Sequence, residues 1–90
     1  MKKKVELFKK AMNLLKKKSE YATHCDEYFE HHPFDDDAEE AFDRAYEAEY
    51  YAFNWAASIL MELIGVDERT AKAMIRTKED EINSLIERLV

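Results

Sequence analysis

The 90-residue chain contains one glycine, one proline and one cysteine. Sheet proteins of this size need several tight turns, whose backbone dihedrals come mainly from Gly, Pro, Asn and Asp. These residues are scarce here or clustered in one place, which excludes sandwiches, barrels, Rossmann-type folds and a glycine-rich phosphate loop. We therefore expect an all-α protein with a single helical domain over residues 1–90, because a second core would need roughly another hundred residues.

The lone cysteine, Cys25, cannot form an internal disulfide, so a cytoplasmic location is expected. Met1–Lys4 resembles the start of a signal peptide, but Glu6 and Lys9 interrupt the apolar stretch of about seven residues that such a peptide needs. The most apolar window, 50–64, is shorter than the roughly 20 residues that span a bilayer. Neither export nor a membrane partner is expected.

Charge is distributed unevenly along the chain, whose net charge is -6. Residues 1–18 hold eight lysines and one acid, residues 19–50 hold twelve acids and one arginine, and residues 51–90 hold seven acids and five bases. Such a separation is typical of a protein that meets a charged partner. It also occurs in bundles that place opposite charges on neighbouring helices for solubility.

Pro33 and Gly65 divide the chain into three helices, predicted over about 3–31, 36–64 and 67–89. The residue before a proline is disfavoured in the α region, and a glycine adopts the left-handed conformation that ends a helix. Aspartates precede the second and third helices, where they can cap the first turn. Since short connections make neighbours antiparallel, we predict an antiparallel three-helix bundle with two long helices and a shorter third.

Apolar residues at spacings of three, four and seven define the predicted buried face of each helix. In the first helix this face comprises Leu7, Ala11, Leu14, Tyr21, Cys25 and Tyr28, flanked by Phe8, Leu15, Ala22 and Phe29. In the second it is a ridge of small residues, Ala38, Ala41, Ala45, Ala48, Ala52 and Ala56, continued by Ile59 and Leu63. In the third it is Ala71, Met74, Ile75, Ile82, Leu85, Ile86 and Leu89.

The antiparallel register pairs residues of the first two helices whose numbers sum to about 67. Lys18 lies within the first apolar face and Glu49 lies beside the alanine ridge. We therefore predict a partly buried structural pair between Lys18 and Glu49. The alternative is that both long side chains reach solvent.

Helix lengths predict an uncovered end of the first hairpin. The two long helices measure roughly 43 Å and the third roughly 33 Å, at 1.5 Å per residue. The hairpin end, about residues 25–42, then lacks a third helix over Cys25, Tyr28, Phe29, Phe34 and Phe42. This end is either a binding or dimerisation surface or a small core of its own aromatic residues.

The outward side of the second helix carries a row of carboxylates one helical turn apart. Steps of four, three and four place Asp36, Glu40, Asp43 and Glu47 on one line, which Tyr50 and Tyr51 continue. Carboxylates at this spacing can imitate a phosphate strand and engage a basic groove, with tyrosines where bases would stack. An ordinary solvated face has the same composition, although it usually intersperses more basic residues.

The sequence favours neither a metal site nor nucleophilic catalysis. Glu20, His24, Glu27 and His31 share the outer side of the first helix beside Cys25, but di-iron bundles use ligands from several helices, so no metal site is expected. Cys25 lies on the apolar face, where cysteine acts as a small hydrophobe, and no loop offers an oxyanion site. No catalytic residue and no cofactor are expected, and the protein is predicted not to be an enzyme.

Direct nucleic-acid binding competes with the acidic surface as a function. Lysines of the first helix and the basic residues Arg69, Lys72 and Arg76 could contact phosphates. The acidic balance of the whole chain opposes this contact, so direct nucleic-acid binding is not expected.

Across its full length the chain resembles, in overall character only, the small acidic inhibitors encoded by phages and mobile elements, of the anti-CRISPR kind. It is very short, acidic and all-helical, without a diagnostic motif. The resemblance implies an inhibitor that occupies a nucleic-acid site on its target, although the lysine-rich first helix departs from a pure nucleic-acid mimic.

The leading prediction is a non-enzymatic interaction module or inhibitor. Its acidic helix face and hairpin tip, with Phe34, would dock on a basic protein surface, for which a nucleic-acid-binding protein is one candidate. The alternative is a self-associating structural bundle, a homodimer driven by the aromatic residues of the tip.

Overall fold

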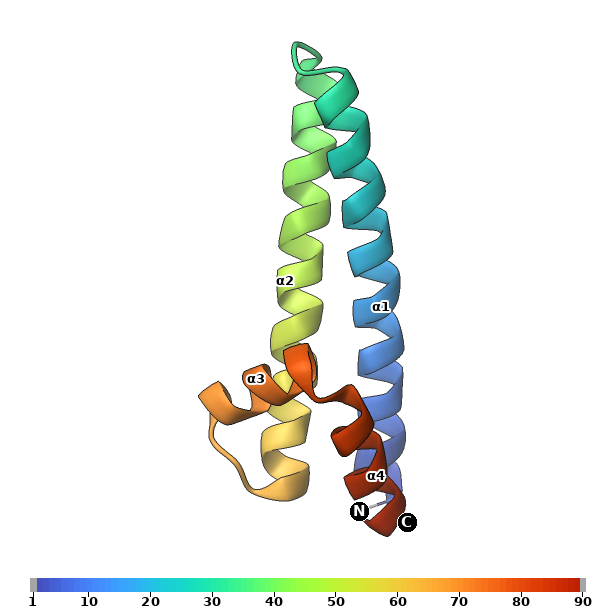
Figure 1. Cartoon of the computed structure of the whole chain (residues 1–90), viewed down its shortest axis with the longest axis vertical. Coiled ribbons are helices and arrows are strands. Elements are labelled where there is room, and N and C mark those ends of the chain that lie inside the picture. Colours follow the sequence, from blue (N-terminus) through green and yellow to red (C-terminus); the bar gives the residue numbers. More distant parts are fainter. Residues whose placement is uncertain (1, 90) are drawn as a thin grey trace.

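The computed structural model describes residues 2–89 and contains four helices within them. They are α1 (Lys2–His31), α2 (Asp36–Ile64), α3 (Glu68–Thr77) and α4 (Glu79–Leu89). The prediction of an all-α fold is confirmed, while the prediction of three helices is wrong, because the third segment forms two helices. The described chain is elongated, with extents of 49 × 21 × 18 Å, and the long axis follows the α1–α2 hairpin (Figure 1).

The two long helices form an antiparallel hairpin whose ends follow the predicted capping chemistry. The Asp35 carboxylate accepts hydrogen bonds from the backbone N–H groups of Asp37 and Ala38, at 3.0 and 3.3 Å. Gly65 ends α2 at φ 68°, and its N–H donates to the Met61 carbonyl at 3.0 Å. Local sequence therefore determines where α2 begins and ends.

The register of the hairpin lies close to the predicted one. Lys4 Nζ and Glu62 Oε2 are 3.5 Å apart, and their numbers sum to 66. At the other end, the rings of Phe29 and Phe42 pack edge to face with centroids 5.9 Å apart. Between these points the contact uses small side chains, since Ala22, Ala38, Ala45 and Ala52 are buried.

The side of α1 that faces α2 is one edge of the apolar face predicted from the sequence. Phe8, Ala11 and Ala22 are buried, and Leu15 and Phe29 are half-buried. The other edge of the predicted face is exposed, with exposed fractions of 41%, 37%, 58% and 52% for Leu7, Leu14, Tyr21 and Tyr28. The apolar arc of α1 is wider than one neighbouring helix can cover, and α2 covers only one edge of it.

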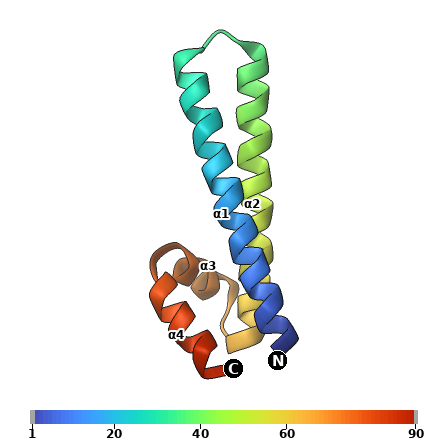
Figure 2. The ribbon, with the colours of Figure 1, turned by 90° about the vertical axis from the view of Figure 1, so that its right-hand side faces the viewer.

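The predicted third helix breaks at Lys78, whose φ of -133° and ψ of 45° are not helical. Thr77 precedes the break, and its hydroxyl donates to the Ala73 carbonyl at 2.7 Å. Glu79, Asp80 and Glu81 follow it in the first turn of α4, where the helix dipole favours acidic side chains. The break lets α4 turn back beside α1, so that the described end of α4 lies near the beginning of α1 (Figures 1 and 2).

The core lies at the base of the molecule, where α3 and α4 pack on the hairpin. All the buried residues predicted for the third segment contribute to it except Leu85, which is partly buried, and Leu89, whose side chain lies outside the described residues. The core consists of Val5, Phe8, Ala11, Ala56, Ala57, Ile59, Leu60, Leu63, Ala71, Met74, Ile75, Ile82 and Ile86.

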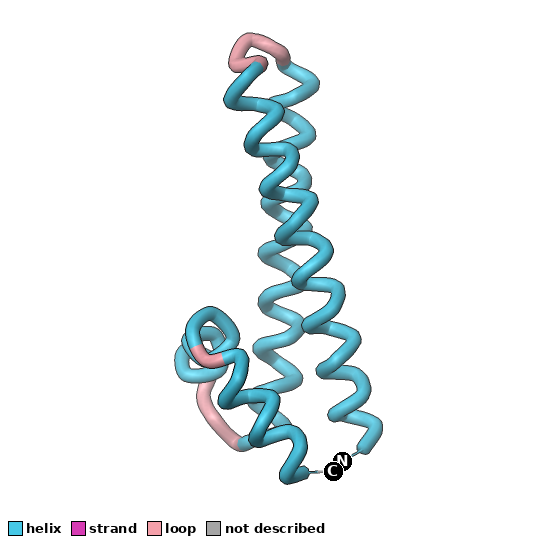
Figure 3. The backbone as a smooth tube through the Cα atoms, turned by 45° about the vertical axis from the view of Figure 1, so that its right-hand side comes forward, coloured by secondary structure: helices cyan, strands magenta, loops and turns pink. Residues whose placement is uncertain are grey.

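The upper hairpin has no third helix beside it within residues 2–89 (Figures 2 and 3). The helix lengths predict an uncovered end at about residues 25–42 under one long third helix, whereas the break at Lys78 ends α3 at Thr77 and turns α4 back toward the base. It projects away from the base as two helices joined by the short turn that Figure 3 shows at the top. Both helices therefore present to solvent the sides that do not face each other.

Stability at the start of α3 is expected to depend on pH through Asp67. Hydrogen bonds from the hydroxyl and backbone N–H of Thr70, the latter at 2.8 Å, hold the pKa of the Asp67 carboxyl below its ordinary range. Since the pKa is lower in the folded chain, the cap stabilises α3 above the ordinary pKa and is lost as pH falls through the lowered value. An NMR titration should show the Asp67 carboxyl and the Thr70 amide titrating together below the ordinary range. An Asp67 pKa in the ordinary range would contradict this prediction.

Candidate interaction site

The predicted carboxylate row is a continuous exposed surface on α2. Asp36, Glu40, Asp43 and Glu47, which we call the acidic face, are all exposed. Tyr50 and Tyr51 extend this surface with exposed fractions of 55% and 64%. Their rings lie edge to face with centroids 6.0 Å apart. One helix thus presents four carboxylates and two phenol groups on one side.

The acidic face is largely free of ion pairs within the described chain. Arg44 pairs with Glu40, and both side chains are exposed. The other three ion pairs found among residues 2–89 join Lys4 to Glu62, Lys72 to Glu68 and Lys78 to Glu81. The carboxylates of Asp36, Asp43 and Glu47 therefore take part in none of the ion pairs found among residues 2–89.

The tip, residues 32–35, carries the most exposed of the large apolar side chains in residues 2–89. Phe34 is 98% exposed. The turn that holds it is well ordered by hydrogen bonds, since the His32 N–H donates to the Phe29 carbonyl at 3.0 Å and the Asp35 N–H to the His32 carbonyl at 3.1 Å. The His32 ring also stacks on Tyr28, with centroids 4.1 Å apart. A firmly held turn thus presents an apolar ring at the N-terminal end of the acidic face.

The sequence left two alternatives for the aromatic residues of the hairpin end, an exposed interaction surface or a small core of their own. The structure contains both. Phe29 and Phe42 pack together as a small contact between α1 and α2. Phe34 lies outside that contact, and Tyr28 is 52% exposed. The tip has a modest core of its own and still presents apolar surface.

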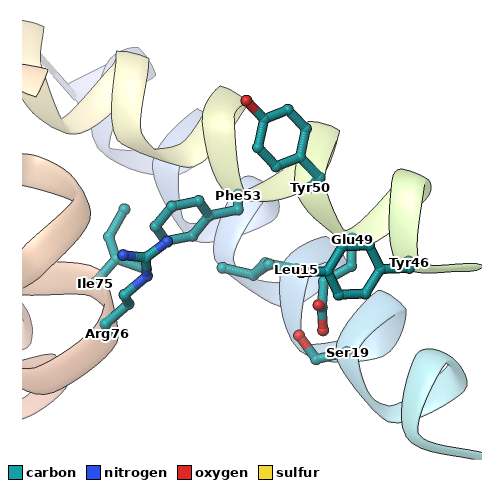
Figure 4. A pocket seen from close by; sticks show the side chains of 8 residues that line it. All are labelled: Leu15, Ser19, Tyr46, Glu49, Tyr50, Phe53, Ile75 and Arg76. Carbon is teal, nitrogen blue, oxygen red and sulfur yellow. The ribbon is translucent and has the colours of Figure 1, made fainter. Parts of the chain in front are cut away.

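A groove of about 320 Å³ lies beside the hairpin, above the end of α3 (Figure 4). Leu15 and Ser19 line it from α1, and Ile75 and Arg76 from α3. The Arg76 guanidinium lies over the Phe53 ring, 4.7 Å from its centroid, which is cation–π geometry. This groove could not be predicted from the sequence, since Arg76 and Phe53 meet only through the packing of α3 on α2.

The predicted pair between Lys18 and Glu49 is not among the ion pairs of the described residues. Glu49 lines the groove together with Ser19, and on its other side it borders Thr23. Lys18 precedes Ser19 by one residue and so points about 100° away from it around α1. Both residues are half-buried, and the four ion pairs found among residues 2–89 do not include this one.

The histidine and cysteine side chains of α1 do not converge on one point. Within the described part of the chain, no group of three or more His, Cys, Asp or Glu side chains has the arrangement of a metal site. Cys25 is a half-buried free thiol.

Among residues 2–89, the helices lack the combination of length and apolar composition that a bilayer span requires.

Comparisons with protein-family models, with curated proteins and with solved structures find no match to this chain. The fold and the site together define its class, a helical hairpin anchored by a C-terminal helix pair that presents an acidic, aromatic surface.

Proposed function

We propose that this protein is a non-enzymatic interaction module that docks the acidic face and the tip on a basic protein surface. The main support for this proposal is the arrangement of four exposed carboxylates along one side of α2, with Phe34, which is 98% exposed, at the N-terminal end of the row. Charge would guide the encounter, and the apolar ring would supply contact area that is lost to water on docking.

The placement of these residues supports a docking role over a purely solubilising one. A solvated face usually offsets its acids with bases four residues away, whereas Arg44 is the one base among residues 35–50. Exposed phenylalanine adds nothing to solubility. A ring held at the end of an acidic row is typical of an interface with an apolar centre and charged surroundings.

The partner class that fits best is a basic protein, and a nucleic-acid-binding protein is a specific candidate. The carboxylates of the acidic face follow one another at roughly 5 to 6 Å, as neighbours three and four residues apart on a helix do. A protein groove lined with Lys and Arg to hold phosphates would meet this row with complementary charge. In that case the chain would act as an inhibitor that competes with nucleic acid.

Charge reversal tests the role of the acidic face. The triple variant Glu40→Lys/Asp43→Lys/Glu47→Lys is expected to lose partners that the wild-type chain captures from a cell lysate at low salt. Because exposed charges are screened by salt, wild-type capture should also weaken as ionic strength rises.

The matched control reverses three exposed acids elsewhere on the same half of the hairpin. Glu20→Lys/Glu27→Lys/Glu30→Lys changes the net charge by the same amount but leaves α2 intact. It should retain the captured partners that the first variant loses. Equal capture by wild type and by both variants would refute docking through the acidic face, and equal loss in both variants would indicate a nonspecific charge effect.

A further inference from the structure

One side of the hairpin is apolar over most of its length and stays uncovered in the described chain. On α1 it carries Leu7, Leu14, Tyr21 and Tyr28, all between 37% and 58% exposed. These residues are seven apart, which is the spacing of a seam between packed helices. They extend over about 31 Å of the helix at 1.5 Å per residue.

The α2 helix completes this side with smaller residues. Ala41, Ala48 and Trp55 are also seven apart, and they lie beside the hairpin contact on the edge away from the groove. Both alanines are half-buried, and Trp55 is 40% exposed. We call the seven residues together the open face: Leu7, Leu14, Tyr21, Tyr28, Ala41, Ala48 and Trp55.

The short helices lie on the opposite side of the hairpin, so they leave the open face accessible (Figure 2). Phe8, Lys9 and Met12 border α4, and Phe53 contacts Arg76 of α3. Successive side chains of a helix are rotated by about 100° around its axis. The residues that contact α3 and α4 therefore lie on the edge of each long helix opposite to the edge that carries the open face. Nothing within residues 2–89 covers the open face.

Charged residues border the open face with opposite signs on its two edges. Along α1 the exposed border carries positive charge at Lys3, Lys10 and Lys17, and His24 and His31 continue the row at the same spacing. Along α2 it is mainly acidic, with Glu40, Glu47 and Glu62 exposed and Arg44 paired with Glu40. Positions that flank an apolar seam commonly select the partner through such charges.

We infer that the open face binds the open face of a second copy of this chain, so that two hairpins form a four-helix arrangement. The two-fold axis runs along the hairpins, their tips lie at the same end, and α1 of each copy lies beside α2 of the other. Tyr21 and Tyr28 of one copy then meet Ala48 and Ala41 of the other, so large side chains enter the spaces left by small ones. The basic border of each α1 meets the acidic border of the other α2.

The reverse arrangement fits less well. With tips at opposite ends, α1 would lie against α1 and α2 against α2. Large residues would then oppose large residues and alanines would oppose alanines, while the acidic borders of the two α2 helices would repel. Size and charge complementarity therefore select both the occupant and its orientation.

Sedimentation equilibrium at low salt tests the dimer. The wild-type chain should shift from monomer to dimer as its concentration rises. Tyr21→Glu should weaken the dimer by at least about tenfold, because an interfacial aromatic is lost and a charge is introduced. The matched control is Tyr46→Glu on the groove side, since the exposed fractions of Tyr46 and Tyr21 are 60% and 58%. This control should dimerise as the wild type does.

Exchange of charge between the copies tests the orientation. Lys17→Glu and Glu47→Lys each replace two symmetry-related attractions by repulsions, so each alone should weaken the dimer on the order of tenfold. An equimolar mixture of the two variants should restore it, because every altered residue then faces its opposite charge. Lys16→Glu, which reverses a charge beside the groove side of α1, should have no such effect.

A wild-type chain that remains monomeric up to millimolar concentration overturns the inference. Equal weakening by Tyr21→Glu and Tyr46→Glu overturns the assigned face, and failure of the mixture to dimerise overturns the orientation. Thermal melts of each variant report whether the monomer fold persists. Glu40 and Glu47 belong both to the acidic face and to the acidic border of the open face, whereas Phe34 and Asp43 belong to the docking surface alone. Phe34→Ala and Asp43→Lys therefore test partner capture without changing the open face or its border, so capture can fail while dimerisation holds, and the reverse.

Discussion

Replacing Phe8 by alanine is expected to lower the free energy of unfolding by about 3 to 5 kcal/mol. Phe8 is the largest fully buried side chain, at 1% exposed, and it belongs to the core that joins α1 to the other three helices. Domains of this size have a total stability of about 5 to 15 kcal/mol, so the loss takes a large part of it. Urea denaturation followed by circular dichroism measures the change.

Phe34→Ala is the matched control for this prediction. It makes the same chemical change at a ring that is 98% exposed, so the free energy of unfolding should stay within about 0.5 kcal/mol of wild type. Similar losses in the two variants would contradict the placement of the core at the base of the hairpin.

Replacing Ile82 by alanine is expected to cost about 2 to 5 kcal/mol, although Ile82 lies in the short α4 helix. Its side chain is 1% exposed, and it borders the same cavity as Phe8. A freely fraying C-terminal helix would lose almost nothing from this substitution. The size of the loss therefore reports whether α4 packs on α1.

A double-mutant cycle tests whether Phe8 of α1 and Ile82 of α4 stabilise each other. If Phe8 and Ile82 act in one cluster, the double variant should differ from the sum of the two single losses by about 0.5 to 3 kcal/mol. Strict additivity would indicate that the two residues are stabilised by separate neighbours.

The start and end of α2 and the start of α3 could be predicted because local chemistry decides them. Asp35 and Asp67 accept the hydrogen bonds of an N-cap, and Gly65 adopts a left-handed conformation. The break at Lys78 could not be predicted from hydrophobic spacing, because the apolar residues keep a helical spacing on both sides of Lys78. The acids at 79–81 are the signal that a new helix begins there.

The buried side of α1 could not be chosen from the sequence alone. Phe8, Leu15, Ala22 and Phe29 and the neighbouring row of Leu7, Leu14, Tyr21 and Tyr28 both repeat every seven residues. Which row is buried depends on where α2, α3 and α4 pack, and that is a tertiary property.

The exposed carboxylates could be predicted with more success because they depend only on helical spacing. The acidic face follows from one helix that has no break between Asp36 and Ile64. The conformation of the tip depends on the turn around Pro33. Sequence spacing alone could not show that Phe34 points away from both helices.

The most direct measurement is a calorimetric titration of the captured basic protein with four versions of the chain: wild type, Phe34→Ala, Glu40→Lys/Asp43→Lys/Glu47→Lys and Glu20→Lys/Glu27→Lys/Glu30→Lys. Docking through the tip and the acidic face predicts that the second and third versions bind at least about tenfold more weakly, while the fourth binds like wild type. Equal affinity of all four versions, with their folds intact by circular dichroism, would contradict the proposed function.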